Sequence, residues 1–410
     1  MSLSSRNPKS HSSMAIRAII LISILCYISY YANAEETLSS SISKEEHLEI
    51  DEQLKQLNKS TVKTIQRDDG SIYDCVDFYK QPAFDHPLLK DHNYHHTMKP
   101  SSRPTKLNKN INENENKTNI EYEMVEIKGL GCPTGTVPVK RTTKEDLIRS
   151  KLFTKAFSSG VITPQTVEKQ GLHHAVLQTK PGGKYNGGGV IMSLHGLATT
   201  IKPHYSVSHM TIKNGPDTIQ VGWMVNPGLY GDSHTHAFIF SQAGGRSCFY
   251  THCSGFVIVN TEIPLDQVYK LLSKRGEAVY VTQFFIYRDA INGNWWLEYG
   301  KDGTQIGFWP GRIFSSLNTG SNHVEWGGEA YTPPGQKPTR MGNGFRPRGD
   351  SRKDAFMDQI TIIDESHKQV IAANTQKFID NVHLYNVMDW GLKGSYGHVF
   401  SYGGPFISSF

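Results

Sequence analysis

The sequence predicts a mainly β protein, with an antiparallel sandwich or barrel formed by the residues from Ala175 onward. Apolar runs of strand length recur along this part, and Gly, Asn, Asp or Pro punctuates most of the gaps between them. The 410 residues include 37 glycines, 18 phenylalanines, 19 tyrosines and 6 tryptophans, a usage that favours strands and tight turns. The runs do not alternate with helical patterns, as they would in a parallel α/β sheet.

The N-terminus has the three parts of a secretory signal, which we place at residues 1–34. Arg6, Lys9 and Arg17 precede an apolar stretch over residues 18–31, which closes with the small-residue site Ala32-Asn33-Ala34. The alternative is an uncleaved membrane anchor, which fits less well because the stretch is short for a span. We expect a secreted protein, on an extracellular, cell-wall or vacuolar route, with no membrane span after signal cleavage.

Residues 35–160 predict a small α+β region. Ser43 and Glu46 resemble a capping box at the start of a helix. The His-, Lys- and Asn-rich residues 91–119 predict an exposed, disordered linker without a core. Strands are expected over 72–79, 121–127 and 131–139, and a helix capped by Thr143 over 142–157.

Residues 161–410 contain the strand pattern that defines the fold class. The clearest runs lie at 175–177, 189–192, 219–225, 237–240, 255–259, 278–287, 295–299, 306–309, 323–331 and 360–363. Their spacing suits an antiparallel sandwich of the kind in which one face of each strand packs into a core.

Four cysteines remain if the signal, with Cys26, is removed. An even number in an exported chain suggests disulfides, and four cysteines permit three pairings. We favour Cys248–Cys253, which closes a short loop between two strand-like runs, together with Cys75–Cys132. Four buried free thiols are the alternative. Two sequons predict glycosylation, at Asn58 and Asn116.

Composition excludes several classes of protein. The formal net charge is only +5, so we expect no nucleic-acid partner. The only apolar run that approaches the length of a membrane span lies at the N-terminus, which argues against a multi-span transporter. There is no G-x-S-x-G elbow for serine hydrolysis. His234 and His236 lack a third ligand at a recognisable spacing, and we expect neither a metal nor a cofactor.

Two strands carry polar residues that could form a hydrolytic site. Alternation over 219–225 places Gln220 with Gly222 and Met224 on one face. Alternation over 324–331 places Glu325, Gly327, Glu329 and Tyr331 together. A carboxylate could take a proton from water while an amide N–H stabilises the oxyanion. The alternative is that both side chains are solvated or pair with the backbone.

Many ordered motifs resemble those of the neprosin family of secreted, mostly plant, glutamic peptidases. In the first part they are Ile72-Tyr73-Asp74-Cys75-Val76-Asp77, Lys80-Gln81-Pro82-Ala83-Phe84-Asp85-His86-Pro87 and Gly131-Cys132-Pro133-Thr134-Gly135. In the second part they include Ile219-Gln220-Val221-Gly222-Trp223, Val225-Asn226-Pro227-Gly228-Leu229-Tyr230, Cys253-Ser254-Gly255-Phe256, Val324-Glu325-Trp326-Gly327-Gly328-Glu329 and Tyr402-Gly403-Gly404-Pro405. The resemblance covers nearly everything after the signal.

The resemblance implies an activation propeptide joined to a β-sandwich peptidase domain. The family's catalytic pair is two glutamates, and its best-known member cleaves after proline at acidic pH without metal. The second glutamate falls on Glu329, whereas the first falls on Gln220. Fungal glutamic peptidases, a different family with a similar sandwich, use a Gln–Glu pair, so the substitution does not forbid activity. In that case Glu329 is the general base and Gln220 orients the water.

The predicted function is therefore a secreted, acid-active, post-proline glutamic endopeptidase, made as a zymogen with residues 35–160 as its propeptide. Its expected partners are a peptide or protein substrate, in particular a proline-rich one, and its own propeptide. Tyr230, Tyr331 and Glu325 are candidates for the substrate groove, whereas Trp223 and Trp326 are assigned to the core. The alternative is a catalytically inactive extracellular binding or cell-wall protein, which the glutamine at position 220 favours.

Overall fold

The computed structural model describes residues 43–107, 120–127, 129–158 and 170–405. The expected signal peptide, the sequon at Asn116 and the expected boundary between residues 160 and 161 lie outside the described residues. None of the helices within these four ranges is long and apolar enough to cross a membrane.

One sheet of the sandwich contains both strands that sequence reasoning singled out. Its strand order is β10-β9-β8-β7-β15-β5-β18, and each neighbouring pair is antiparallel. The bounds are β5 (Leu172–Thr179), β7 (Tyr205–Asn214), β8 (Asp217–Val225), β9 (His236–Ala243), β10 (Arg246–Phe249), β15 (His323–Tyr331) and β18 (Thr375–Ile379).

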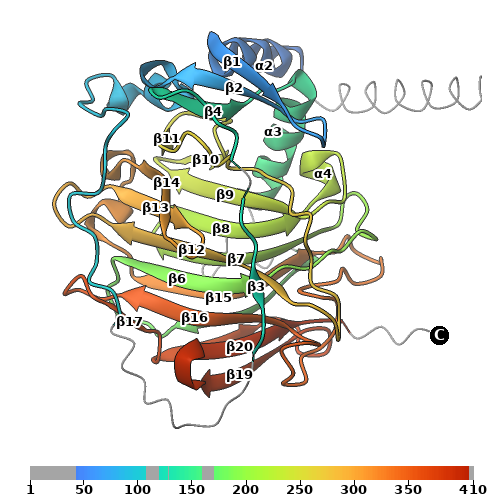
Figure 1. The fold of residues 1–410 in the computed structure, drawn as a ribbon. Helices are drawn as coiled ribbons and strands as arrows, with labels where there is room; N and C mark the ends of the chain where they lie inside the picture. The colour runs from blue at the N-terminus through green and yellow to red at the C-terminus, as the bar shows by residue number, and fades with distance from the viewer. Residues whose placement is uncertain (1–42, 108–119, 128, 159–169, 406–410) are drawn as a thin grey trace, which may run out of the picture.

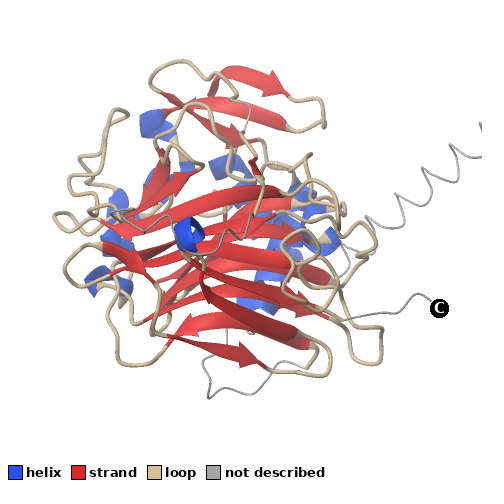
Figure 2. Cartoon of the chain, turned by 60° about the horizontal axis from the view of Figure 1, so that its bottom comes forward, coloured by secondary structure: helices blue, strands red, loops and turns tan. Residues whose placement is uncertain are grey.

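The second sheet stacks against the first, and together they form the bulk of the molecule (Figures 1 and 2). Its order is β11-β14-β13-β12-β6-β16-β20-β19, with β17 beside β16 and β3 beside β12. The bounds are β3 (Glu123–Met124), β6 (Gly187–Ser193), β11 (Val257–Ile258), β12 (Tyr280–Arg288), β13 (Trp295–Tyr299), β14 (Thr304–Trp309), β16 (Ala355–Ile363), β17 (Gln369–Ile371), β19 (Asn386–Leu392) and β20 (His398–Gly403). The prediction of a mainly antiparallel β fold is confirmed.

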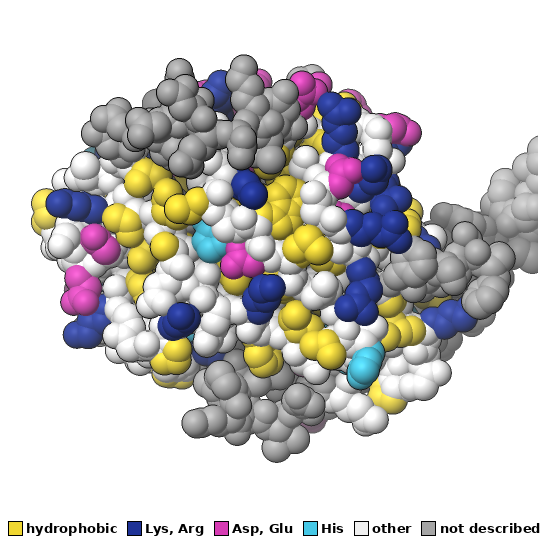
Figure 3. Space-filling view, turned by 90° about the horizontal axis from the view of Figure 1, so that it is seen from below, with side chains coloured by type: hydrophobic (Ala, Val, Ile, Leu, Met, Phe, Trp, Pro, Cys, Tyr) yellow, Lys and Arg dark blue, Asp and Glu magenta, His cyan; other side chains and the backbone are white. Residues whose placement is uncertain are grey.

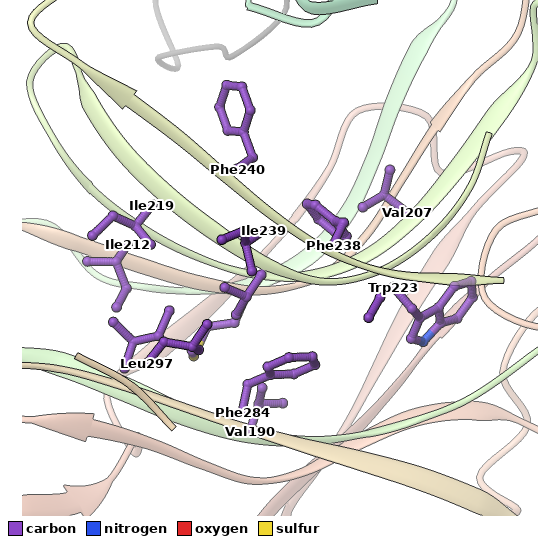
Figure 4. Close-up of a cluster of buried hydrophobic side chains, with 14 of the residues drawn as sticks. Val190, Val207, Ile212, Ile219, Trp223, Phe238, Ile239, Phe240, Phe284 and Leu297 are labelled. Atoms are coloured by element: carbon purple, nitrogen blue, oxygen red, sulfur yellow. The ribbon is translucent and has the colours of Figure 1, made fainter. Parts of the chain in front are cut away.

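The core lies between the two sheets and is largely aliphatic and aromatic. Ile212 and Trp223 of the first sheet face Val190, Phe284 and Leu297 of the second (Figure 4). All of these side chains are 3% exposed or less. Burial of this much apolar surface is the main favourable term in the stability of such a domain.

From below, the molecule presents scattered apolar groups and separate Lys and Arg side chains (Figure 3).

The N-terminal part is a small α+β unit at one end of the sandwich (Figure 1). It contains α2 (Lys44–Leu57), α3 (Lys144–Ser158) and a three-stranded sheet of β1 (Thr61–Gln66), β2 (Ile72–Asp77) and β4 (Thr136–Lys140). The capping box of Ser43 and Glu46 is present. Short helical turns elsewhere are α4 (Pro227–Tyr230) and the 3₁₀ segments Phe78–Lys80, Pro82–Asp85, Pro87–Leu89, Gly311–Ile313, Leu317–Thr319 and Gly394–Tyr396.

Both favoured disulfides form, Cys75–Cys132 within the N-terminal part and Cys248–Cys253 at β10. Neither bridge joins the N-terminal part to the sandwich. The Asn58 side chain is exposed, but its amide donates to the Thr142 carbonyl (2.8 Å) and accepts from the Thr142 N–H (3.1 Å). A glycan on Asn58 Nδ2 would therefore compete with an existing hydrogen bond.

The described portion of the expected exposed linker, residues 91–107, is largely exposed but makes specific contacts with the sandwich. The Arg103 guanidinium makes two hydrogen bonds to Glu298, at 2.9 and 2.6 Å, and Glu298 is only 1% exposed. The backbone N–H of Ser101 donates to Asp289 at 2.6 Å. Pairing with the buried carboxylates Glu298 and Asp289 thus holds part of this polar segment against the sandwich.

A buried carboxylate anchors the N-terminal part to the sandwich. Asp266, in the loop between β11 and β12, pairs with Lys140 (2.7 Å) and accepts a hydrogen bond from the Tyr73 hydroxyl (2.8 Å). Burial would raise the pKa of Asp266, but the Lys140 charge and the two hydrogen bonds outweigh it and lower the pKa.

We expect Asp266→Asn to lower the free energy of unfolding at pH 7 by about 1–3 kcal/mol, because Lys140 loses its counter-charge. The range lies below that of a fully buried pair because the Lys140 side chain is 33% exposed. Since the folded pKa of Asp266 is lowered, its contribution is complete above the unfolded pKa of about 4 and is lost as the pH falls through the folded value.

Urea unfolding of wild type and variant, at neutral pH and well below pH 4, measures this difference. The matched control is Asp85→Asn, which removes the exposed pair of Lys59 and Asp85 and should cost less than about 1 kcal/mol. Equal losses in the two variants, or a loss from Asp266→Asn that does not shrink at low pH, would contradict the expectation.

Candidate active site

Two tryptophans determine which way the candidate residues face. On β8 the Trp223 indole N–H donates to the Ser193 carbonyl of β6 at 2.9 Å, and on β15 the Trp326 indole N–H donates to the Gly189 carbonyl of β6 at 3.2 Å. Both rings are therefore fixed between the sheets. Because neighbouring residues of a strand point to opposite faces, Gln220 and Glu329 lie on the outer face of the first sheet.

Gln220 and Glu329 line one groove on that outer face. The groove has a volume of about 950 Å³ and receives side chains from β18, β5, β15, β7 and β8. Thr211 and Glu325 also line it, as does the ring of Phe378 at its edge. Gln220 and Glu329 are each 5% exposed, so both polar groups are largely shielded from bulk water.

The strand register places the two residues on a diagonal across β7. Gln220 pairs with Thr211, whereas Glu329 pairs with Val207. His209 lies midway between these two positions on β7 and faces the groove side. A carboxylate and an amide thus approach the groove from opposite ends, with an imidazole between them.

Glycines flank the His209 position on both sides. Gly222 of β8 and Gly327 of β15 are the cross-strand partners of His209, so neither neighbouring strand places a side chain directly beside the imidazole. Their φ values are +158° and +150°, and a Cβ at either position would overlap the carbonyl oxygen of an adjacent strand. Only glycine therefore fits at either position.

Aromatic rings surround the Glu329 end of the groove. Burial and the neighbouring Glu329 carboxylate raise the pKa of the Tyr205 phenol well above its usual value. Tyr205 stacks on Tyr331 with ring centroids 5.6 Å apart, and Phe153 of α3 contacts Tyr205 edge-on at 5.0 Å. The N-terminal part therefore reaches the immediate surroundings of Glu329.

Glu325, the other glutamate of β15, is held as an anion. Burial would raise the pKa of Glu325, but a hydrogen bond from His323 at 2.9 Å and the charges of His323, His209 and His174 lower it to about 2. Burial lowers the pKa of His209 to about 4, against an opposing effect of Glu325. Glu325 is thus a poor proton donor and serves as a fixed negative charge in the groove.

Gln220 presents an unused acceptor. Its side-chain oxygen Oε1 is buried and has no hydrogen-bond partner among residues 43–107, 120–127, 129–158 and 170–405. An unpaired buried amide oxygen is costly, so it marks a position where a water or a ligand can bind.

Of the three groove candidates, Glu325 lines the groove and the two tyrosines do not. The assignment of Tyr230 is wrong, because the chain turns into α4 after β8 and carries this ring away from the site. Tyr230 is hydrogen-bonded to Tyr250 and stacks on His236, with ring centroids 3.9 Å apart. Tyr331 stacks behind Glu329, on Tyr205.

Sequence reasoning missed two histidines that the structure brings to Glu329. His174 Nδ1 lies 4.0 Å from Glu329 Oε2, and the ligand atoms of His174, His209 and Glu329 lie within 4.8 Å of one another. The available signal was strand alternation over residues 205–212, which places His209 on the face of Thr211. In a second group of potential metal ligands, Asp232 lies beside His234 and His236. Asp232 is the third potential ligand that sequence spacing did not reveal for this pair of histidines.

Comparison with solved structures finds glutamic peptidases. Scytalido-glutamic peptidase, solved with a peptide-based transition-state analogue, is 13% identical over 57% of this chain and 98% of its own, with a TM-score of 0.32. SCP-B, a member of the eqolisin family solved with the tripeptide Ala-Ile-His, is 10% identical over 57% of this chain and 98% of its own, with a TM-score of 0.30.

Comparison with protein-family models gives two matches that follow one another along the chain. The model of the neprosin activation peptide matches residues 64–178, which include α3 and all of β5 except Thr179. The neprosin model matches residues 202–405, which include both Gln220 and Glu329. Because both models match, the activation peptide before the neprosin domain, the chain belongs to the neprosin family.

Proposed function

We propose that this protein is a secreted glutamic endopeptidase, made as a zymogen, active in acid and selective for proline-containing peptides. The observation that carries the proposal is that Gln220 and Glu329 line the same shielded groove on the outer face of one sheet. We place the signal at residues 1–34, the propeptide at 35–160 and the peptidase domain at 161–410.

In the proposed reaction Glu329 is the general base. Its ionised carboxylate takes a proton from a water molecule, whose oxygen attacks the carbonyl carbon of the scissile peptide. The Gln220 amide N–H donates to the oxyanion of the tetrahedral intermediate, and its oxygen Oε1 accepts from the water before attack. When the C–N bond breaks, the protonated Glu329 returns its proton to the leaving amine.

The surroundings of the pair support this assignment of roles. Glu325, with its pKa near 2, stays ionised in acid and offers a fixed charge to the substrate backbone or a basic side chain. The Phe378 ring at the groove edge is 36% exposed, and an exposed aromatic face suits a proline ring.

The alternative is a family member that binds peptides without cleaving them. The glutamine at position 220 favours this, because it replaces the first glutamate of the family's catalytic pair. In that case the groove would still hold an extended chain, and Glu329 would contribute only to binding.

We expect Glu329→Gln to reduce kcat/KM for a proline-rich peptide by about 10²–10⁴, because the variant has no base to accept the water proton. Purified secreted protein is assayed from pH 3 to pH 7, and circular dichroism checks that the variant is folded. Glu277→Gln, in an exposed loop with its side chain 65% exposed, is the matched control and should keep full activity. Cleavage that persists in Glu329→Gln would reject Glu329 as the base, and a wild type that binds but does not cleave would favour the alternative.

We expect Gln220→Glu to move the acid limb of the pH profile of kcat/KM to higher pH, by roughly one unit. A second carboxylate in the same groove disfavours the ionised form of Glu329, so the base would become protonated at a higher pH than in the wild type. Gln305→Glu, on β14 of the other sheet, adds the same charge away from the groove and should leave the profile in place. Superimposable profiles for wild type and Gln220→Glu would argue against electrostatic coupling between positions 220 and 329.

A further inference from the structure

His174 and Glu329 line the groove and His209 lies fully buried beside them, in an arrangement that peptide hydrolysis by Gln220 and Glu329 does not use. His174 of β5 pairs directly with Glu329 of β15, and His209 projects from β7 on the other side of β15. Their ligand atoms all lie within 4.8 Å of one another. Three adjacent strands therefore present two imidazoles and one carboxylate to a common point.

Both imidazoles carry a nitrogen that no described group satisfies. The His209 ring is fully buried. Its Nδ1 is hydrogen-bonded to Thr211 Oγ1 at 2.9 Å, while its Nε2 has no hydrogen-bond partner in the described part of the chain. His174 Nε2 is likewise buried without a described partner. A buried polar nitrogen of this kind indicates a missing ligand, since native structures rarely leave one unpaired.

The support of the His209 ring resembles that of a metal ligand. The hydrogen bond between Thr211 Oγ1 and His209 Nδ1 fixes the ring and leaves Nε2 as the nitrogen available to an ion. The backbone N–H of His174 donates to Asp380 at 2.6 Å, which fixes this position on β5.

We propose that His174, His209 and Glu329 form a binding site for a divalent transition-metal ion such as Zn²⁺, and that the bound ion inhibits the peptidase. Two imidazoles and one carboxylate are a usual ligand set for Zn²⁺, with a water in the fourth position. Ligand atoms around tetrahedral Zn²⁺ lie about 3.3 Å apart, so small side-chain rotations would close the site. The inhibition rests on the proposed function, because a metal-bound Glu329 carboxylate cannot take a proton from water.

The second group of potential ligands, Asp232, His234 and His236, differs in its hydrogen bonding. Asp232 already accepts from His236 Nε2 at 2.9 Å and from the backbone N–H of His234 at 2.8 Å. The His234 side chain is 69% exposed. This cluster is satisfied without an ion, and its exposed histidine makes it a matched control.

The binding test uses the full secreted chain, after removal of bound metal, in equilibrium dialysis against Zn²⁺ at neutral pH. Co²⁺ serves as a spectroscopic probe, because its visible absorption reports a tetrahedral site with nitrogen ligands. We expect one site per chain in the wild type and in His234→Asn. We expect affinity at least about 100-fold weaker in His209→Asn, His174→Asn and Glu329→Gln, since even supporting residues around a metal cost 10- to 100-fold.

Two outcomes of the binding test overturn the proposal: no binding to the wild type, or a site lost in His234→Asn but kept in His174→Asn. If His209→Asn does not fold, the binding test of His174→Asn still decides the proposal. The His174 ring is partly exposed, so its replacement should be tolerated by the fold. A separate assay measures peptide cleavage with Zn²⁺ and then with excess chelator. Inhibition that chelator reverses supports the proposal, and cleavage that Zn²⁺ leaves unchanged or accelerates overturns the inhibitory role. A wild type without cleavage would reject the proposed function, while the dialysis result would still decide the metal site.

Discussion

The hydrogen bonds of Trp223 and Trp326 to one strand of the opposite sheet are the constraint on which the site depends. Each indole donates to a carbonyl of β6, at 2.9 and 3.2 Å, so β8 and β15 cannot shift by one residue without losing a buried donor. A shift of that size in either strand would turn its polar residues into the core. The tryptophans thus keep Gln220 and Glu329 on the outer face, although neither ring touches the groove.

The same outer face explains why the groove can combine so many titratable groups. His323, His209 and His174 lie close enough to Glu325 to lower its pKa to about 2, against the opposing effect of burial. Groups with a perturbed pKa in a cleft are typical of functional sites.

Sequence alone was sufficient for the fold class, the two disulfides and the outward direction of Gln220 and Glu329, because strand alternation is local information. It could not give the order of strands, which brings β5 and β7 to either side of β15 and so delivers His174 and His209. Tyr230 was misplaced for a related reason: the strand ends at Val225, as predicted, but the sequence did not show that α4 then carries Tyr230 away from the groove. The contacts of residues 91–107 could not be predicted because their partners, Glu298 and Asp289, lie almost 200 positions further along the chain.

The N-terminal part contacts both sheets, with Phe153 near the groove and Arg103 on Glu298 of the second sheet. Neither disulfide joins it to the sandwich. A break in the backbone between α3 and β5 would therefore leave two fragments held together by noncovalent contacts alone, as in a nicked heterodimer. Their separation would then be a dissociation equilibrium, so that dilution into a large volume, as well as the cut itself, would govern when Phe153 leaves its contact with Tyr205.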